Sequence, residues 1–215
     1  TGPQALQFEK EFAGFLGDSG GESDNRLHCL AVNSATSGLH LALEAIGVGP
    51  GDLVAVPTMT FTATAEVVRY LGAEPLFIDS SPDTWNICAG RLADAVRNLA
   101  TSGRKLKALI AVHLAGLACD MDALRDAVGD DVTIIEDAAH AFPCATDRGM
   151  VGTLGDIGVF SFYATKTITT GEGGMVVTRN GQYAERMRVM RLHGIDRTVW
   201  NRYSGPAEAR SWEYD

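Results

Sequence analysis

One lysine lies in a segment whose neighbours could make its side-chain amine reactive. Lys166 follows the apolar run 157–163 and precedes a turn-rich stretch at 171–174. A lysine beside apolar walls can lose its proton, and the neutral amine can form a Schiff base with a carbonyl. Lys166 is therefore a candidate nucleophile, although a surface lysine at the end of a strand would have the same local pattern.

Two adjacent carboxylates end another apolar run. Residues 132–135 are typical of a buried strand, Glu136 and Asp137 follow directly, and His140 comes three residues later. A buried carboxylate is costly unless it has a cationic partner. Because adjacent strand residues point to opposite faces, we expect only one of the two carboxylates to reach a shared site. The pattern alone also allows a carboxylate that caps the next helix and a structural, hydrogen-bonded histidine.

Small polar residues at 33–38 connect a predicted strand to a predicted helix. Free backbone N–H groups at a helix start, together with the positive end of the helix dipole, can bind an anion. Thr36 and Ser37 add hydroxyl donors. The segment matches neither the Walker motif nor the dinucleotide-binding glycine motif, and an ordinary serine or threonine N-cap is the simpler alternative.

Taken together, these three features meet the needs of pyridoxal phosphate. Its phosphate needs an anion-binding cradle, its pyridine nitrogen needs an acidic partner, and its aldehyde needs a lysine. Phe61, just after a predicted strand, could stack on the ring, or it could be a core aromatic. The sequence therefore predicts a pyridoxal phosphate site.

The elements that must position these residues alternate between strands and helices. The hydrophobic pattern predicts strands at 28–32, 53–56, 74–78, 107–113, 132–135, 157–163 and 175–178, and helices at 7–15, 39–46, 62–71, 91–99, 121–128 and 183–191. Strands that are apolar throughout indicate an α/β fold, a three-layer αβα sandwich with a mostly parallel, mixed sheet. Ligands bind such sheets beyond the carboxyl ends of the strands.

Composition excludes several classes of protein. The 215 residues are 46% hydrophobic and 21% charged, which is enough apolar area for a sizeable core. The 18 basic and 27 acidic residues give a net charge of −9, with no basic run that could track a nucleic acid. The longest uncharged stretch, 27–43, is interrupted by polar residues, so we expect no membrane span.

The cysteines and the chain ends bear on location and completeness. None of the four cysteines forms a C-x-x-C pair or a zinc-like Cys/His spacing, so we expect buried thiols, no metal site and a cytoplasmic protein. The chain reaches an amphipathic segment at once, so we expect no signal peptide; it does not begin with Met, and it stops after a polar stretch. We therefore expect a fragment of a longer chain.

The sequence resembles the DegT/DnrJ/EryC1/StrS family of sugar aminotransferases, which are pyridoxal phosphate enzymes of aspartate-aminotransferase fold type I. The resemblance covers nearly the whole chain. It rests on S-A-T-S-G-L-H-L-A-L from Ser34, P-T-M-T-F-T-A-T-A from Pro57, V-H-L-A-G from Val112, E-D-A-A-H-A from Glu136, G-D-I-G-V-F-S-F from Gly155, and Y-A-T-K-T-I-T-T-G-E-G-G-M-V-V-T from Tyr163.

The resemblance implies a role for each of these residues. Lys166 matches the Schiff-base lysine, and Asp137 matches the carboxylate on the pyridine nitrogen. His140 falls where the family has a Gln or His near the phenolic oxygen. The remaining matches are the phosphate contacts Thr36, Ser37 and Ser161 and the stacking aromatic Phe61. One departure is Ala35, where the family usually has Gly; alanine still offers its N–H but restricts φ.

The resemblance also implies an activity. We expect transfer of an amino group from an amino acid, glutamate or glutamine, to a keto sugar, most simply a nucleotide-linked one. The alternatives are an aminotransferase for a cyclitol or another ketone, and a non-catalytic sensor or regulator that keeps the fold. The family implies a homodimer with its sites at the subunit interface. We expect a large cofactor-binding domain at 1–195, and an irregular segment at 196–215 leading toward a small C-terminal domain absent from this chain.

Overall fold

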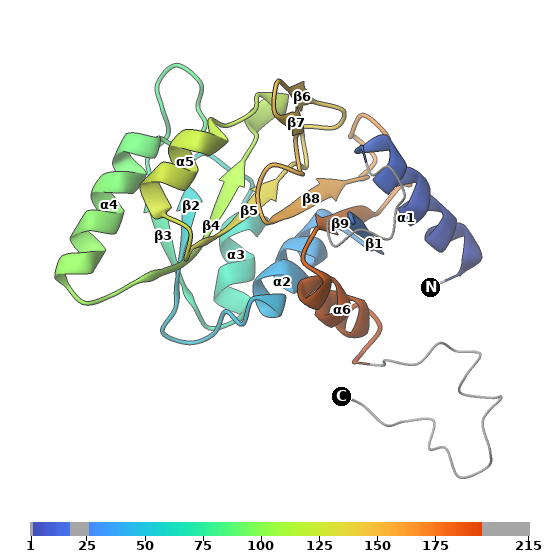
Figure 1. Ribbon diagram of the computed structural model, residues 1–215, viewed down its shortest axis with the longest axis horizontal. Coiled ribbons are helices and arrows are strands. Elements are labelled where there is room, and N and C mark those ends of the chain that lie inside the picture. The colour runs from blue at the N-terminus through green and yellow to red at the C-terminus, as the bar shows by residue number, and fades with distance from the viewer. Residues whose placement is uncertain (1, 18–25, 195–215) are drawn as a thin grey trace, which may run out of the picture.

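The computed structural model describes residues 2–17 and 26–194, in which helices and strands alternate along most of the chain (Figure 1). The helices are α1 (Pro3–Phe15), α2 (Ala35–Ala45), α3 (Ala63–Tyr70), α4 (Ala89–Thr101), α5 (Met121–Val128), α6 (Gly181–Met190) and the 3-10 turn η1 (Leu114–Gly116). The strands are β1 (His28–Val32), β2 (Leu53–Pro57), β3 (Glu74–Ile78), β4 (Leu106–Val112), β5 (Thr133–Asp137), β6 (Ala145–Thr146), β7 (Gly149–Met150), β8 (Ile157–Ser161) and β9 (Gly174–Thr178).

Seven strands form one mixed sheet in the order β1-β9-β8-β5-β4-β2-β3. The pairs from β8 across to β3 are parallel, whereas β9 is antiparallel to both of its neighbours, β8 and β1. In this sheet six strands therefore run one way and β9 runs the other. The carboxyl ends of the six strands and the beginning of β9 lie at the same edge, and the predicted α/β fold with a mostly parallel sheet is confirmed.

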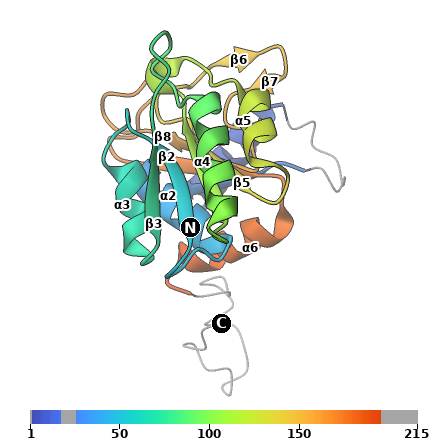
Figure 2. The ribbon, with the colours of Figure 1, turned by 90° about the vertical axis from the view of Figure 1, so that its left-hand side faces the viewer.

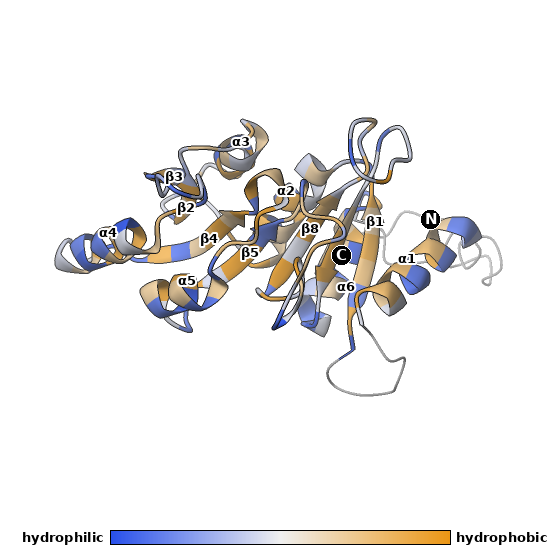
Figure 3. Ribbon diagram, turned by 90° about the horizontal axis from the view of Figure 1, so that it is seen from above, coloured by the Kyte–Doolittle hydropathy of each residue, from blue (hydrophilic) through white to orange (hydrophobic). Residues whose placement is uncertain are grey.

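Helices cover both faces of the sheet and complete three layers (Figure 2). Strand β2 illustrates the division, because its alternate residues enter different clusters. Val54 and Val56 pack with α2, α3 and α6 on one face, while Leu53 and Ala55 pack with α4 and α5 on the other. The aromatic helix α1 covers β1, β8 and β9 on the face that carries α4 and α5. The strands are mostly hydrophobic, and the outer helices mix hydrophobic with hydrophilic residues (Figure 3).

The start of α2 lies unusually close to the sheet, and two glycines permit this approach. A Cβ atom on Gly38 would come within 2.8 Å of Val159 Cγ1 and 3.0 Å of Val176 Cγ2. A Cβ atom on Gly174 would come within 2.9 Å of the backbone of Ala35. The first turn of α2 therefore packs directly against β8 and β9, at the edge where every strand of the sheet except β9 ends.

Most predicted elements match the structure, and the largest difference lies at α2. The strands at 28–32 and 74–78 and the helix at 121–128 have the predicted bounds. The prediction that residues 33–38 precede a helix at 39–46 was wrong, because α2 begins at Ala35. Ser34 and Ser37 form a capping box that starts the helix four residues earlier. The short β6–β7 hairpin and the turn η1 were not predicted.

None of the four cysteines, all of which lie in the described residues, forms a disulfide; Cys29 and Cys119 are buried, and burial raises the pKa of the Cys119 thiol to about 12. Within 2–17 and 26–194, none of the helices combines the length and apolar character needed to cross a bilayer. The predicted irregular segment 196–215 lies outside the described residues.

Candidate active site

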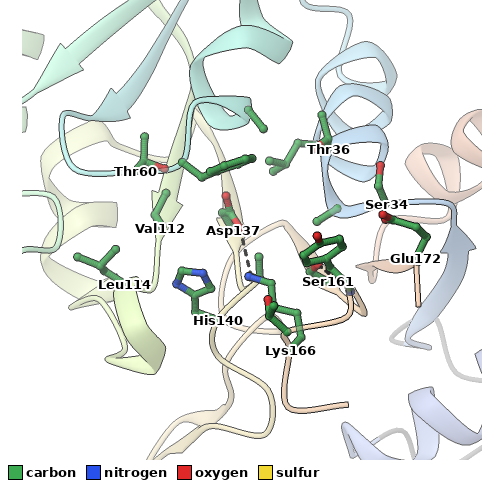
Figure 4. A pocket seen from close by; sticks show the side chains of 18 residues that line it. Ser34, Thr36, Thr60, Val112, Leu114, Asp137, His140, Ser161, Lys166 and Glu172 are labelled. Atoms are coloured by element: carbon green, nitrogen blue, oxygen red, sulfur yellow. Dashed lines mark hydrogen bonds between the residues drawn. The ribbon is translucent and has the colours of Figure 1, made fainter. Parts of the chain in front are cut away.

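A cavity of about 610 Å³ lies at the sheet edge where six strands end. This volume falls within the range of small-molecule sites. The cavity is lined from five parts of the chain: the start of α2, the segment before α3, the end of β4, the end of β5, and the segment between β8 and β9. In Figure 4, Lys166, His140 and Asp137 lie together, while Ser34, Thr36 and Glu172 lie to one side of them.

The first turn of α2 lies where the sequence predicts an anion-binding cradle. The side chain of Ser34 accepts the amide of Ser37, which leaves the amides of Ala35 and Thr36 without an acceptor in the described part of the chain. Ala35 is the first helical residue and does not have positive φ, so alanine fits where glycine was expected. Free amides at the positive end of a helix dipole are suited to bind a phosphate.

Of the three hydroxyl groups predicted to contact the phosphate, two line the cavity and one does not. Thr36 and Ser161 line the cavity. Ser161 Oγ accepts the amide of Tyr163 at 3.3 Å, so its own proton remains available as a donor. Ser37 is not among the lining residues, and its Oγ is committed to Asn33 Oδ1 at 2.6 Å and the Ser34 carbonyl at 2.8 Å. The structure thus gives Ser37 a helix-capping position, and its predicted phosphate contact stays a prediction.

Asp137 reaches the cavity from the end of β5 and is 6% exposed. Its Oδ2 accepts the hydroxyl of Thr64 at 3.0 Å, and its Oδ1 accepts the amide of Ala139 at 3.2 Å. Burial raises the pKa of Asp137, and the two hydrogen bonds oppose this rise. A buried carboxylate in this condition favours a ligand that brings a positive charge.

Lys166 is half-buried in the turn between β8 and β9 and lines the same cavity. Burial lowers the pKa of Lys166, and the nearby Asp137 acts in the opposite direction. The pKa of His140 is also lowered, first by burial and then by the charge of Lys166, while Asp137 raises it. These shifts favour a neutral amine and a neutral imidazole at the centre of the cavity.

Phe61 lines the cavity and is 76% exposed. An aromatic ring left this open beside a cavity offers a flat apolar surface to a ligand. Its predicted stacking role stays a prediction.

Glu136 points to the opposite side of β5 and takes no part in lining the cavity. Its carboxylate accepts the amides of Gly152, Leu154 and Gly155 at 2.6–2.8 Å, and it lies 2.9 Å from His113 Nε2. Because His113 Nδ1 accepts the amide of Cys119, the ring proton lies on Nε2 and is donated to Glu136. Both side chains are fully buried, so this pair fixes the turns beneath the site.

Sequence reasoning missed Thr60, Thr64, His113 and Glu172. Thr60 and Thr64 are four residues apart in a threonine-rich stretch, which was a usable signal for a shared face. His113 directly follows a strand, and a buried polar residue there needs a partner. Glu172 lines the cavity near the cradle, and nothing in the isolated pattern pointed to it.

The residues present fit pyridoxal phosphate. The free amides at the start of α2 and two hydroxyl groups line one part of the cavity. The buried carboxylate of Asp137, whose pKa is raised, lines another part, and the amine of Lys166, whose pKa is lowered, lies beside it. These are the groups that a phosphate, a protonated ring nitrogen and an aldehyde require.

Comparisons with known proteins give the family. The model of the DegT/DnrJ/EryC1/StrS aminotransferase family matches residues 1–209. The chain is 43% identical over 215 residues to the spore coat polysaccharide biosynthesis protein SpsC of Bacillus subtilis (strain 168), covering 100% of this chain and 51% of SpsC. It is 42% identical over 199 residues to GDP-perosamine synthase of Caulobacter vibrioides, covering 91% of this chain and 50% of that enzyme.

A solved structure has the same fold. The PLP-form of Spr1654 from Streptococcus pneumoniae, described as a sugar aminotransferase, superposes with a TM-score of 0.77 at 29% identity. The match covers 90% of this chain and 52% of Spr1654. This chain therefore spans about half the length of the relatives that it matches.

Proposed function

Because the chain belongs to the DegT/DnrJ/EryC1/StrS aminotransferase family, we propose that it forms the cofactor-binding part of a pyridoxal-phosphate-dependent sugar aminotransferase. The observation that carries the proposal is the meeting of Lys166, Asp137 and the α2 cradle in one cavity. Each of these features has an ordinary structural explanation alone. A chance assembly of all three, in one cavity and in a family of aminotransferases, is the weaker explanation.

Pyridoxal phosphate, when bound, supplies an aldehyde that joins to amines and a ring that withdraws electrons. The amides of Ala35 and Thr36 and the hydroxyl of Ser161 would bind its phosphate. Asp137 would hold a proton on the ring nitrogen, because a buried carboxylate is stabilised by an adjacent positive charge. His140 would lie beside the phenolic oxygen, as the family resemblance implies.

Lys166 would hold the aldehyde between turnovers and move a proton during them. Burial lowers the pKa of Lys166, so its neutral form is more accessible than that of an ordinary lysine, and a neutral Nζ would accept a proton from the α-carbon of an amino donor. Once protonated, Nζ would serve as the acid that returns this proton. Asp137 would hold a proton on the ring nitrogen of the bound cofactor.

The acceptor is proposed from the names of the relatives. GDP-perosamine synthase carries a nucleotide sugar in its name, and SpsC is named for polysaccharide synthesis. We infer a nucleotide-linked keto sugar as acceptor and glutamate or glutamine as donor. The cradle offers a few neutral donors to a phosphate of nearly two charges, so further donors from a second subunit would complete it. We therefore infer a homodimer with interface sites, and the absence of a disulfide among the four described cysteines supports a reducing, cytoplasmic location.

The test uses the full-length protein that contains this chain. After loading with pyridoxal phosphate, we expect an absorption band that is lost on adding glutamate and regained on adding a keto nucleotide sugar. Asp137→Asn should keep the fold and slow turnover by about 10²-fold or more, because the ring nitrogen loses its charged partner. Loaded protein whose spectrum responds to no amino acid donor would refute the proposal and favour a non-catalytic binder.

A further inference from the structure

Two threonine hydroxyls form a chain that ends on Asp137. Thr64 Oγ1 donates to Asp137 Oδ2 at 3.0 Å and lies 2.8 Å from Thr60 Oγ1. Thr64 is completely buried, so its hydroxyl is shielded from bulk water, and Thr60 lines the cavity. The chain therefore connects the wall of the cavity to the back of the Asp137 carboxylate.

The direction of both hydrogen bonds follows from the number of protons. An ionised carboxylate only accepts, so Thr64 gives its single hydroxyl proton to Asp137. In its contact with Thr60, the oxygen of Thr64 can then only accept, which makes Thr60 the donor. The two O–H dipoles are aligned toward the carboxylate, and aligned hydrogen bonds polarise and strengthen one another.

Asp137 depends on these donors before any ligand arrives. Each carboxylate oxygen receives one hydrogen bond from the described protein, Oδ2 from Thr64 and Oδ1 from the amide of Ala139. Burial drives the carboxyl toward its neutral form, while His113, His140 and Lys166, which face it from the segments after β4 and β5 and from the β8–β9 turn, act in the opposite direction together with the two hydrogen bonds. A neutral carboxyl would offer no charge to a ring nitrogen. The hydroxyl that faces Oδ2 therefore favours the charged form of the carboxylate and fixes the plane in which it is held.

We propose that Thr64 is a positioning residue that keeps Asp137 ionised and directed into the cavity, and that Thr60 fixes the direction of the Thr64 proton. The inference rests on the proposed function only for the identity of the group that Asp137 meets. The hydroxyl chain is a property of this polypeptide and can be tested without cofactor.

The experiment titrates Asp137 directly in the full-length, cofactor-free protein. Aspartate labelled with ¹³C at the side-chain carboxyl is followed by NMR as a function of pH, and Asp137→Asn identifies the signal. Thr64→Val keeps the shape of the side chain and removes the donor. We expect it to raise the titration midpoint of Asp137 by about one to two pH units, the size expected for a hydrogen bond to a charged group.

Companion variants separate hydrogen bonding from packing. Thr64→Ser keeps the hydroxyl and should restore the midpoint of the unchanged protein. Thr64→Cys, with a weakly donating thiol, should raise the midpoint and serves if Thr64→Val does not fold. Thr60→Val should raise it by less than Thr64→Val, because Thr64 still donates but loses its own donor. The matched control is Thr62→Val, since Thr62 precedes the same helix with no side-chain capping bond.

Each result decides the matter. An unchanged midpoint in Thr64→Val, or an equal rise in Thr64→Ser, overturns the role of Thr64, and an unchanged midpoint in Thr60→Val overturns the role of Thr60. A protein that shows the predicted rises but binds no pyridoxal phosphate supports the hydroxyl chain and refutes the proposed function. In protein that does bind pyridoxal phosphate, the pH dependence of its dissociation constant should move with the Asp137 midpoint.

Discussion

Glu136 and Asp137 are adjacent at the end of β5, yet their carboxylates enter opposite halves of the molecule. Asp137 lines the cavity on the face that carries α2 and α3, while Glu136 is fully enclosed by backbone amides and His113 on the other face. The two-residue period of a strand produces this separation. One carboxylate is thereby left for a ligand, and the other holds the turns that support it.

Glu136→Gln should destabilise the fold. Each oxygen of Glu136 accepts two N–H donors, so either orientation of the glutamine amide turns its NH₂ group toward donors. We expect the free energy of unfolding to fall by about 3 kcal/mol, because hydrogen bonds to a buried charged group are lost and N–H donors are left unsatisfied. Urea denaturation measures this. Glu185→Gln, which alters an exposed pair with Arg188, is the control and should cost less than about 1 kcal/mol. If Glu136→Gln kept full stability but lost transamination, Glu136 and not Asp137 would be the catalytic carboxylate.

Lys166 should be the site of covalent cofactor attachment. Its amine lies in the cavity beside Asp137, and its lowered pKa favours the reactive neutral form. Borohydride reduction of the loaded full-length protein, followed by peptide mapping, should place the label on Lys166. Lys166→Ala should lose the label, and Lys107→Ala should keep it. A label on Lys105 or Lys107 instead would contradict the assignment.

The rate at which Lys166 is chemically modified should depend on pH in a way that reflects its burial and the nearby Asp137. Burial disfavours the charged ammonium, so in cofactor-free protein the modification of Lys166 by an amine reagent should have its midpoint below the ordinary lysine value of 10.5. Asp137 raises this pKa, so Asp137→Asn should lower the midpoint further. Quantitative mass spectrometry of the labelled peptide measures both. Asp130→Asn, exposed beyond the opposite end of β5, should leave the midpoint in place. A rise in the midpoint in Asp137→Asn would show that Asp137 does not stabilise the charged form of Lys166.

Gly38→Ala should weaken both the fold and the cradle. The added methyl group would lie 2.8 Å from Val159 Cγ1 and 3.0 Å from Val176 Cγ2, so the first turn of α2 must move away from the sheet. We expect the free energy of unfolding to fall by about 1–3 kcal/mol. Relative to the unchanged protein, the affinity for pyridoxal phosphate should fall by more than the affinity for pyridoxal, which lacks the phosphate. Thermal denaturation and equilibrium dialysis measure the two effects. Gly49→Ala is the control, because a Cβ atom there meets nothing within 4 Å; equal losses in both variants would exclude the packing explanation.

Local pattern predicted the strands well because they are short, apolar and bounded by turn residues, as at 28–32 and 74–78. It also placed Lys166, Asp137 and the segment 33–38 at strand ends, and a mostly parallel sheet brings such ends to one edge. The start of α2 was misplaced because its capping box outweighs the low helix propensity of serine and threonine.

The supporting contacts could not be predicted in the same way. The partners of Glu136 are backbone amides at 152–155, and amides carry no signature in the sequence. The bond from Thr64 to Asp137 joins residues 73 positions apart, so only the folded sheet reveals it. Ser37 shows the opposite limit: its type suits a phosphate contact, but its hydroxyl is committed to the helix cap.

The pairing of β1 with β9 has a consequence for how the protein is made. β1 is an edge strand whose neighbour in the described sheet is β9, so the first described strand docks on the last described strand. The cradle at the start of α2, which follows β1, and the turn that carries Lys166, which precedes β9, thus come together only after nearly the whole described chain has left the ribosome. Contacts of such long sequence separation form late in folding. During synthesis, the inner strands can assemble before the site is complete, so we expect a nascent chain to bind pyridoxal phosphate only after β9 has emerged.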